Sequence, residues 1–207
     1  MDDRVLPKDA DYFQELQTKT GWSRTLNGFA EWCAPVPGMH TLDVGCGPGL
    51  LPAILSRFGC SAVGVDIDLE MFHPSPLHPL IAAADVISLP FSSHTFDIVT
   101  ATNLLFLLSQ PILALIEMKR VLQPGGRVAL LNPSEKLNVR AADIFAEDLG
   151  LNGMARDTIL NWAKRAEENH RWTENETQEL YKSAGMKCIT SNLKIGPGFG
   201  RFSWGLA

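Results

Sequence analysis

Apolar residues near the start of the chain recur at helical spacing. This period predicts two short helices, over residues 9–20 and 22–33, with a break at Gly21. Two prolines and a glycine within residues 35–38 end the second helix. The chain therefore opens with a helical segment, residues 1–38, ahead of a different pattern.

The period then changes to that of buried strands. Residues 41–44 form a compact apolar run that leads into the glycine-rich segment 45–49, and residues 50–58 return to helical spacing. A second apolar run, residues 62–65, ends at Asp66. Strand, glycine turn, helix and strand in this order predict a parallel βαβ unit.

The alternation continues toward the carboxyl end. Pro111 fits the first turn of a helix, and Thr173 and Glu176 have the spacing of a capping box. The pattern predicts strands at 80–83, 96–101 and 127–131, a turn at 123–126, helices at 111–122, 139–170 and 174–185, and a closing hairpin of 186–194 and 201–205 around a turn at 196–200. We expect one α/β domain over residues 1–207, with N-terminal helices at 1–38, a binding core at 39–132, a helical insertion at 133–172, and a final helix and hairpin at 173–207.

Composition narrows the class of protein. Hydrophobic residues at 45% and charged residues at 20% are typical of a globular protein. No apolar run approaches the roughly 20 residues that cross a bilayer, and the polar, acidic first residues do not resemble a signal peptide. We therefore expect a cytoplasmic protein without membrane insertion. The net charge of −5 argues against a dedicated nucleic-acid binder, because phosphate neutralisation needs a clustered basic surface.

Neither the cysteines nor the histidines show metal-ligand spacing. Without a CxxC or HxxxH pair, a metal held by the protein is not expected. Reduced cysteines that fill small spaces suit a cytosolic protein. The residues concerned are Cys33, Cys46, Cys60, Cys188, His40, His73, His78, His94 and His170.

The segment 45–49, GCGPG, follows a strand and opens a helix. Glycines let the backbone turn tightly and let a ligand approach without a Cβ in the way, and a helix N-terminus offers free N–H groups to an anionic group. Asp66 ends the next strand, 17 residues after Gly49, where a carboxylate is placed to accept hydrogen bonds from ribose hydroxyls. Loop and carboxylate together predict a nucleoside-bearing ligand at the carboxyl ends of the strands.

The loop alone does not separate a dinucleotide from S-adenosylmethionine (SAM). A pyrophosphate-binding loop has the pattern GxGxxG. Here Leu50 takes the place of the third glycine, and Pro48 lies within the loop. This departure disfavours a nicotinamide cofactor. The carboxylate of SAM is smaller than a pyrophosphate and needs less space at the turn.

Residues 42–49, LDVGCGPG, resemble the first motif of the class I SAM-dependent methyltransferases, in the group that acts largely on small molecules. Segments resembling later motifs of that family follow in matching order, at residues 64–68, 85–86, 89–99 and 122–126. The resemblance implies a Rossmann-like three-layer sandwich with a seven-stranded, mostly parallel sheet and an antiparallel last strand. It also implies methyl transfer from SAM to a small-molecule acceptor, with S-adenosyl-L-homocysteine (SAH) as the product.

The resemblance further implies contacts with the cofactor. Asp43 and Gly45 would lie by the amino-acid end of SAM, and Asn103 near its methyl group. Asp66 would hold the ribose, and Asp85 would meet the adenine amino group. The expected cofactor-binding residues are Asp43, Gly45, Cys46, Gly47, Gly49, Asp66, Ile67, Asp85, Val86 and Asn103.

One segment departs from the family pattern. Residues 73–79 contain three prolines where a longer helix is usual, and proline does not fit a helix interior. We predict a helix of one turn followed by an irregular loop.

No catalytic base is assigned. Methyl transfer from a sulfonium depends mainly on holding the acceptor and the methyl group in line, and a base matters only if the acceptor must lose a proton. The residues that could serve, interpreted instead as solvated surface groups, are His94, Glu147, Asp148 and His170.

The acceptor site is expected where the N-terminal helices, the insertion and the turn at 196–200 meet, because variable segments build specificity. Core packing is the favoured interpretation of the aromatic residues that could roof the cofactor: Tyr12, Phe13 and Trp22. Trp162 and Trp172 are interpreted equally well as acceptor-lining or as packing residues. Residues 132–134, Asn-Pro-Ser, resemble the Asn-Pro-Pro motif of amino-group DNA methyltransferases, but they follow the fifth predicted strand rather than the fourth, and nucleic acid is set aside.

Three hypotheses of function remain. The favoured one is a small-molecule methyltransferase. A SAM-binding protein without activity is the second, and a turnover assay would separate it from the first. A nicotinamide-dependent oxidoreductase is the third, and it would bind NAD but not SAH. The acceptor, its reacting atom and the oligomeric state stay open.

Overall fold

The computed structural model describes residues 14–16, 19–71 and 80–206. Most of the predicted helix at 9–20, with Tyr12 and Phe13, and the predicted proline-rich loop at 73–79 lie outside these residues. The one-turn helix predicted before that loop is present as a single 3₁₀ turn, η1 (Leu69–Met71).

Seven strands form one sheet in the order β3-β2-β1-β4-β5-β7-β6. The first five are parallel to one another: β1 (His40–Val44), β2 (Ser61–Asp66), β3 (Leu80–Ala83), β4 (Phe96–Thr102) and β5 (Leu122–Pro133). The closing hairpin consists of β6 (Lys187–Lys194) and β7 (Gly200–Leu206), and β7 runs antiparallel to both β5 and β6. The predicted Rossmann-like sheet is therefore confirmed, including the closing hairpin.

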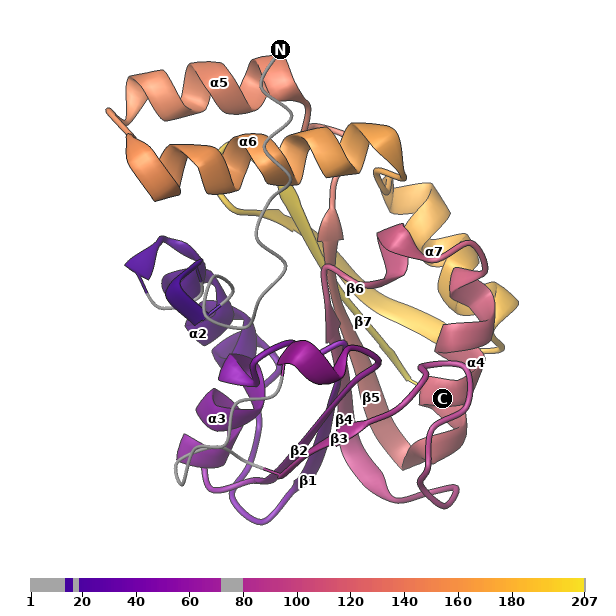
Figure 1. The fold of residues 1–207 in the computed structure, drawn as a ribbon. Coiled ribbons are helices and arrows are strands. Elements are labelled where there is room, and N and C mark those ends of the chain that lie inside the picture. Colours follow the sequence, from indigo (N-terminus) through magenta and orange to yellow (C-terminus); the bar gives the residue numbers. More distant parts are fainter. Residues whose placement is uncertain (1–13, 17–18, 72–79, 207) are drawn as a thin grey trace.

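Helices cover both faces of this sheet and one of its ends. On one face lie α2 (Trp22–Trp32) and α3 (Leu50–Arg57), and on the other lie η2 (Leu105–Leu107), α4 (Pro111–Val121) and α7 (Glu174–Ser183). Figure 1 shows α5 (Val139–Asp148) and α6 (Gly153–Glu168) lying across the end of the sheet where β5 stops. None of the helices in the described part of the chain has both the length and the apolar character needed to cross a bilayer.

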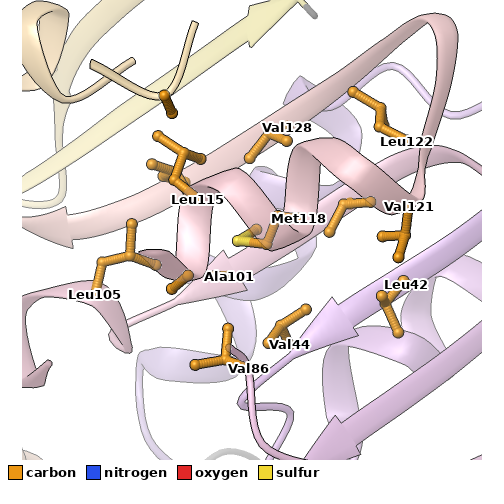
Figure 2. Packing of buried hydrophobic residues seen from close by; sticks show 14 of the residues in the cluster. Leu42, Val44, Val86, Ala101, Leu105, Leu115, Met118, Val121, Leu122 and Val128 are labelled. Carbon is orange, nitrogen blue, oxygen red and sulfur yellow. The ribbon is translucent and has the colours of Figure 1, made fainter. Parts of the chain in front are cut away.

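The core is divided by the sheet into two layers. Val128 and Leu130 of β5 belong to the cluster beneath α4 and α7, part of which is drawn in Figure 2. Ala129 and Leu131 belong to the cluster beneath α2 and α3. Both faces of the strand are therefore buried, which explains why its sequence is continuously apolar rather than alternating.

The fifth strand is longer than predicted at both ends. Phe96 of β4 pairs with Leu122, whereas Ile98 pairs with Arg127, so the predicted turn at 123–126 is an irregularity inside β5. Gly125, at φ +80°, lies within it. Pairing with β7 extends the other end of β5 to Pro133. Tertiary pairing, which a local pattern does not contain, decided both boundaries.

The helical insertion predicted at 139–170 consists of two helices. They are separated by residues 149–152, where Gly150 takes a left-handed conformation (φ +61°). Small buried residues, Ala142 and Ala146 of α5 and Ala163 of α6, let the helices approach closely. The predicted capping box at Thr173 and Glu176 is confirmed at the start of α7.

Candidate active site

The glycine loop between β1 and α3 depends on three left-handed residues. Gly45, Gly47 and Gly49 have φ values of +71°, +52° and +86°. A residue with a Cβ is strained in this region, so glycine is the favoured residue at each position. The N–H groups of Gly45 and Cys46 both donate to the Val65 carbonyl, at 2.8 and 3.0 Å, which ties the loop to the end of β2.

The loop is packed so closely that added atoms would collide with its neighbours. A Cβ on Gly45 would lie 3.1 Å from the Leu104 side chain, and a Cβ on Gly64 would lie 2.7 Å from Cys46 Sγ. Cys46 is buried, and desolvation raises the pKa of its thiol well above the usual value. Cys46 is therefore an unreactive packing residue that supports the loop from below.

Asp66 is joined directly to the loop. Its Oδ2 atom accepts a hydrogen bond from the Gly47 N–H at 2.8 Å, and its Oδ1 atom accepts one from the Asp68 N–H at 3.0 Å. A carboxylate has about four lone-pair positions, so two remain for a ligand. From the sequence, the loop and this carboxylate were predicted to bind the same ligand. The direct hydrogen bond between them was not predicted.

Asp43 lies behind the loop rather than in an open pocket. Its side chain is 1% exposed and accepts a hydrogen bond from Thr100 Oγ1 at 2.7 Å. Burial raises its pKa to about 7; the bond from Thr100 lowers the value, and the nearby charge of Asp66 raises it. A direct contact of Asp43 with the cofactor stays a prediction.

A pocket opens beside the loop at the carboxyl ends of β1 and β2. It brings together five of the predicted cofactor-binding residues: Gly45, Asp66, Ile67, Asp85 and Val86. Ile67 is 73% exposed, so a large apolar side chain is available to a ligand at the rim. A neighbouring pocket continues from Asp85 and Val86 toward the start of α4.

Four further residues line this pocket and were not predicted: Val44, Ala84, Leu104 and Leu108. Leu104 and Leu108 flank η2 and line the same pocket as Gly45 and Asp66. The signal that marks them is the apolar run at 104–108, which comes directly after the fourth predicted strand. The carboxyl ends of parallel strands lie at the same edge of the sheet, so a run that follows the fourth strand is expected near the glycine loop 45–49.

The segment that carries Asp85 is anchored to α4. The Leu89 N–H donates to Glu117 Oε1 at 2.9 Å, and Arg120 donates to the Leu89 and Phe91 carbonyls at 3.1 and 2.9 Å. The hydrogen bond from Arg120 holds the pKa of Glu117 below its usual range. These contacts fix the wall of the pocket after β3.

Asn103 joins the end of β4 to the helical insertion. It has a left-handed backbone (φ +54°), and its N–H donates to the Leu131 carbonyl at 2.8 Å. Its Oδ1 atom accepts a hydrogen bond from Trp162 Nε1 of α6 at 3.0 Å. Trp162 also meets Trp22 of α2 edge to face, with ring centroids 5.6 Å apart. Three segments far apart in the sequence thus converge beside the pocket.

The possible bases do not gather at this pocket. His94 lies at the amino-terminal ends of β4 and β5, with Nδ1 3.1 Å from the Leu122 carbonyl oxygen, on the opposite edge of the sheet. Glu147 and Asp148 are exposed at the end of α5, and His170 packs against Trp172. Across the described ranges, no group of three or more His, Cys, Asp or Glu residues is arranged to hold a metal ion.

Known proteins are similar to this chain in sequence and in architecture. A family described as a methyltransferase domain matches residues 42–130. The demethylmenaquinone methyltransferase of Corynebacterium kroppenstedtii is 31% identical over 163 residues, which cover 75% of this chain and 71% of that protein. The ubiquinone biosynthesis O-methyltransferase of Paracidovorax citrulli is 30% identical over 110 residues, covering 49% of this chain and 46% of the relative.

A solved structure shows the same fold at low sequence identity. Magnesium protoporphyrin IX methyltransferase from Synechocystis PCC 6803, determined with bound SAH, superposes with a TM-score of 0.68 and 15% identity, covering 95% of this chain and 93% of that one. At this identity the likeness concerns the arrangement of helices and strands.

Proposed function

The chain belongs to the class I SAM-dependent methyltransferases, and from this premise we propose that it binds SAM between the glycine loop, Asp66 and Leu104 and methylates a small aromatic molecule. One observation carries the proposal. The Asp66 carboxylate is hydrogen-bonded to the Gly47 amide of the loop, and Asp66 lines a pocket together with four other residues expected to bind the cofactor.

The residues around the pocket fit the parts of SAM. Asp66 retains lone pairs for the two ribose hydroxyls. Ile67 and Val86 offer apolar surface to adenine, and the exposed carboxylate of Asp85 is a suitable acceptor for an amino group. The cofactor's carboxylate is assigned to the amides that follow Gly49 at the start of α3.

The chain contributes position rather than a reactive group. When bound, SAM supplies a methyl group on a positively charged sulfur that departs as a neutral thioether. The left-handed glycines and Asp66 would hold the nucleoside, and Trp22 and Trp162 lie beside Asn103, near which the methyl group is expected. Such alignment lowers a barrier by several kcal/mol without a protein nucleophile, and we assign no base.

The acceptor class is inferred from the side chains opposite the pocket. Trp22 and Trp162 are half-buried and meet edge to face, which suits an aromatic ring as a third partner. Two relatives are named for demethylmenaquinone and ubiquinone biosynthesis. The net charge of −5 supports a small molecule over a nucleic acid. The four free cysteines support the cytoplasm as the compartment.

Calorimetric titration with SAH tests the cofactor site. We expect wild-type protein to bind SAH and not NAD, and Asp66→Ala to weaken SAH binding by about 30-fold or more, because a charged acceptor of several hydrogen bonds is lost. Asp97→Ala is a matched control: Asp97 also accepts a backbone N–H, from His40 at 2.8 Å, but at the opposite edge of the sheet. Absence of SAH binding by the wild type, or equal losses in both variants, would refute the proposed site. SAH release on incubation with SAM and aromatic acceptors then distinguishes an enzyme from an inactive SAM-binding protein.

A further inference from the structure

Two buried side chains beside the candidate active site lack hydrogen-bond partners. Among the described residues, four enclosed polar side-chain atoms lack a partner: Thr41 Oγ1, Asn132 Oδ1, His170 Nε2 and Trp172 Nε1. Two of them, Asn132 Oδ1 and Trp172 Nε1, belong to residues at the end of β5 or bridged to it. The residues are 5% and 8% exposed. Leaving such a group buried and unpaired costs about 1–3 kcal/mol, so its retention calls for an explanation.

The two side chains lie on the same face of the sheet. Asn132 comes two residues after Leu130, whose side chain belongs to the cluster beneath α4 and α7, and alternation places the Asn132 side chain on that face. Trp172 belongs to the same cluster. The backbone N–H of Trp172 donates to the Pro133 carbonyl at 2.9 Å, and the backbone of Trp172 forms a parallel bridge with Ser134. Trp172 therefore flanks the end of β5.

The position of Trp172 is firmly held. The buried Arg201 of β7 donates from Nε to the Trp172 carbonyl at 3.1 Å. Arg201 is itself fixed by Glu135 at 2.9 Å and Ser191 at 2.8 Å. Hydrogen bonds thus hold both the backbone N–H and the backbone carbonyl of Trp172, while the indole Nε1–H has no partner.

This pair adjoins the space expected for the acceptor. Asn132 follows Leu131, whose carbonyl accepts the Asn103 N–H at 2.8 Å. Asn103 in turn binds Trp162, and Trp162 packs against the cluster that contains Trp172. Ligands of open parallel sheets bind beyond the carboxyl ends of the strands, which is where both β4 and β5 end here.

We propose that Asn132 and Trp172 form a subsite for a hydroxyl group of the methyl acceptor. Asn132 Oδ1 accepts a hydrogen bond and Trp172 Nε1 donates one, and a hydroxyl group satisfies both because it donates and accepts. An ether satisfies only the indole, and a hydrocarbon satisfies neither. The subsite therefore favours binding of hydroxylated aromatic acceptors over methoxylated ones. This assignment rests on the proposed function and names its substrate class.

Matched probes test the subsite without knowledge of the natural acceptor. Protein saturated with SAH is titrated with 1-naphthol and with 1-methoxynaphthalene, which share a ring system and differ in the hydroxyl. We expect wild-type protein to bind 1-naphthol about tenfold more tightly, as one hydrogen bond provides. Asn132→Leu and Trp172→Phe should remove most of this preference while leaving the affinity for SAH unchanged. Control variants are Asn192→Leu on the exposed part of β6 and Trp204→Phe on β7, and both should retain the preference.

The outcomes separate this inference from the proposed function. If SAH binds normally but 1-naphthol does not bind, or binds no better than its methyl ether, the subsite is wrong and the cofactor site stands. Equal weakening of both probes in Asn132→Leu assigns Asn132 to packing alone and also refutes the subsite. Failure of SAH to bind refutes the proposed function first.

Discussion

The proposed cofactor side and the proposed acceptor side of the site are built in different ways. The cofactor side consists of backbone conformations and one carboxylate: three left-handed glycines and Asp66 bonded to the Gly47 amide. The acceptor side consists of side chains from distant segments, with Trp22, Asn103 and Trp162 meeting through one hydrogen bond and one ring contact. The first arrangement tolerates few substitutions, whereas the second can change its specificity residue by residue.

The two sides also differ in how they hold polar groups. On the cofactor side, Asp43 and Asp66 are both hydrogen-bonded within the protein. On the acceptor side, Asn132 and Trp172 are buried without partners. A satisfied network fixes a geometry before any ligand arrives, whereas unsatisfied groups gain their partners from the ligand. Variants that affect one side and spare the other test this contrast.

Among the variants that test this contrast, the largest combined effect on stability and cofactor binding is expected from Gly45→Ala. Alanine at φ +71° is strained, and its Cβ would press on Leu104 at 3.1 Å, a residue of the same pocket. We expect a loss of about 2 kcal/mol in the free energy of unfolding. Displacement of Leu104 into the pocket should also weaken SAH binding at least tenfold, as measured by calorimetry.

Gly125→Ala is the matched control for this variant. Gly125 has a similar φ of +80°, but a Cβ there would meet nothing within 4 Å. It should lose about 1 kcal/mol through backbone strain alone and bind SAH as the wild type does. Similar SAH affinities in the two variants would contradict a loop that is shaped by close packing.

An intermediate effect is expected from pH, and it should come from the cofactor side. Burial raises the pKa of Asp43 to about 7, from a usual value of 3.8. Between these values the folded protein binds more protons than the unfolded chain, so stability falls as pH rises from about 4 to 7. Asp43→Asn removes this dependence. Urea unfolding at pH 5 and pH 8 should show the variant gaining about 2 kcal/mol relative to wild type over this interval. Parallel pH profiles would show that Asp43 does not titrate in this range.

The smallest effect is expected from Trp162→Phe on the acceptor side. An aromatic ring is kept, although it is smaller, and the hydrogen bond to Asn103 at 3.0 Å is lost. This should cost about 1 kcal/mol and lower Tm by about 2–4 °C. SAH affinity should stay within about twofold, since Trp162 does not line the cofactor pocket. Trp32→Phe, at a tryptophan that packs through its ring on Phe29 and Phe202, should change Tm less. Tenfold weaker SAH binding by Trp162→Phe would show that Trp162 contributes to cofactor binding, and it would contradict the division into two sides.

Much of the cofactor side could be predicted because its signals are local. A glycine at a left-handed position, or an acid directly after a strand, reports its own backbone environment. Residues 45–49 and Asp66 were therefore predicted as one binding site, and five predicted residues line one pocket. Leu104 and Leu108 were missed because an apolar run does not show whether it faces a core or a ligand.

By itself, the sequence determined the alternation of strands and helices, the glycine turn and the capping box, because each depends on residues close together in the chain. Only the tertiary structure decided the irregular start of β5, the bond between Asn103 and Trp162, and the burial of Asn132 beside Trp172. These features join segments about 30–60 residues apart, and their positions depend on how the strands pair and the helices pack, so no local pattern encodes them.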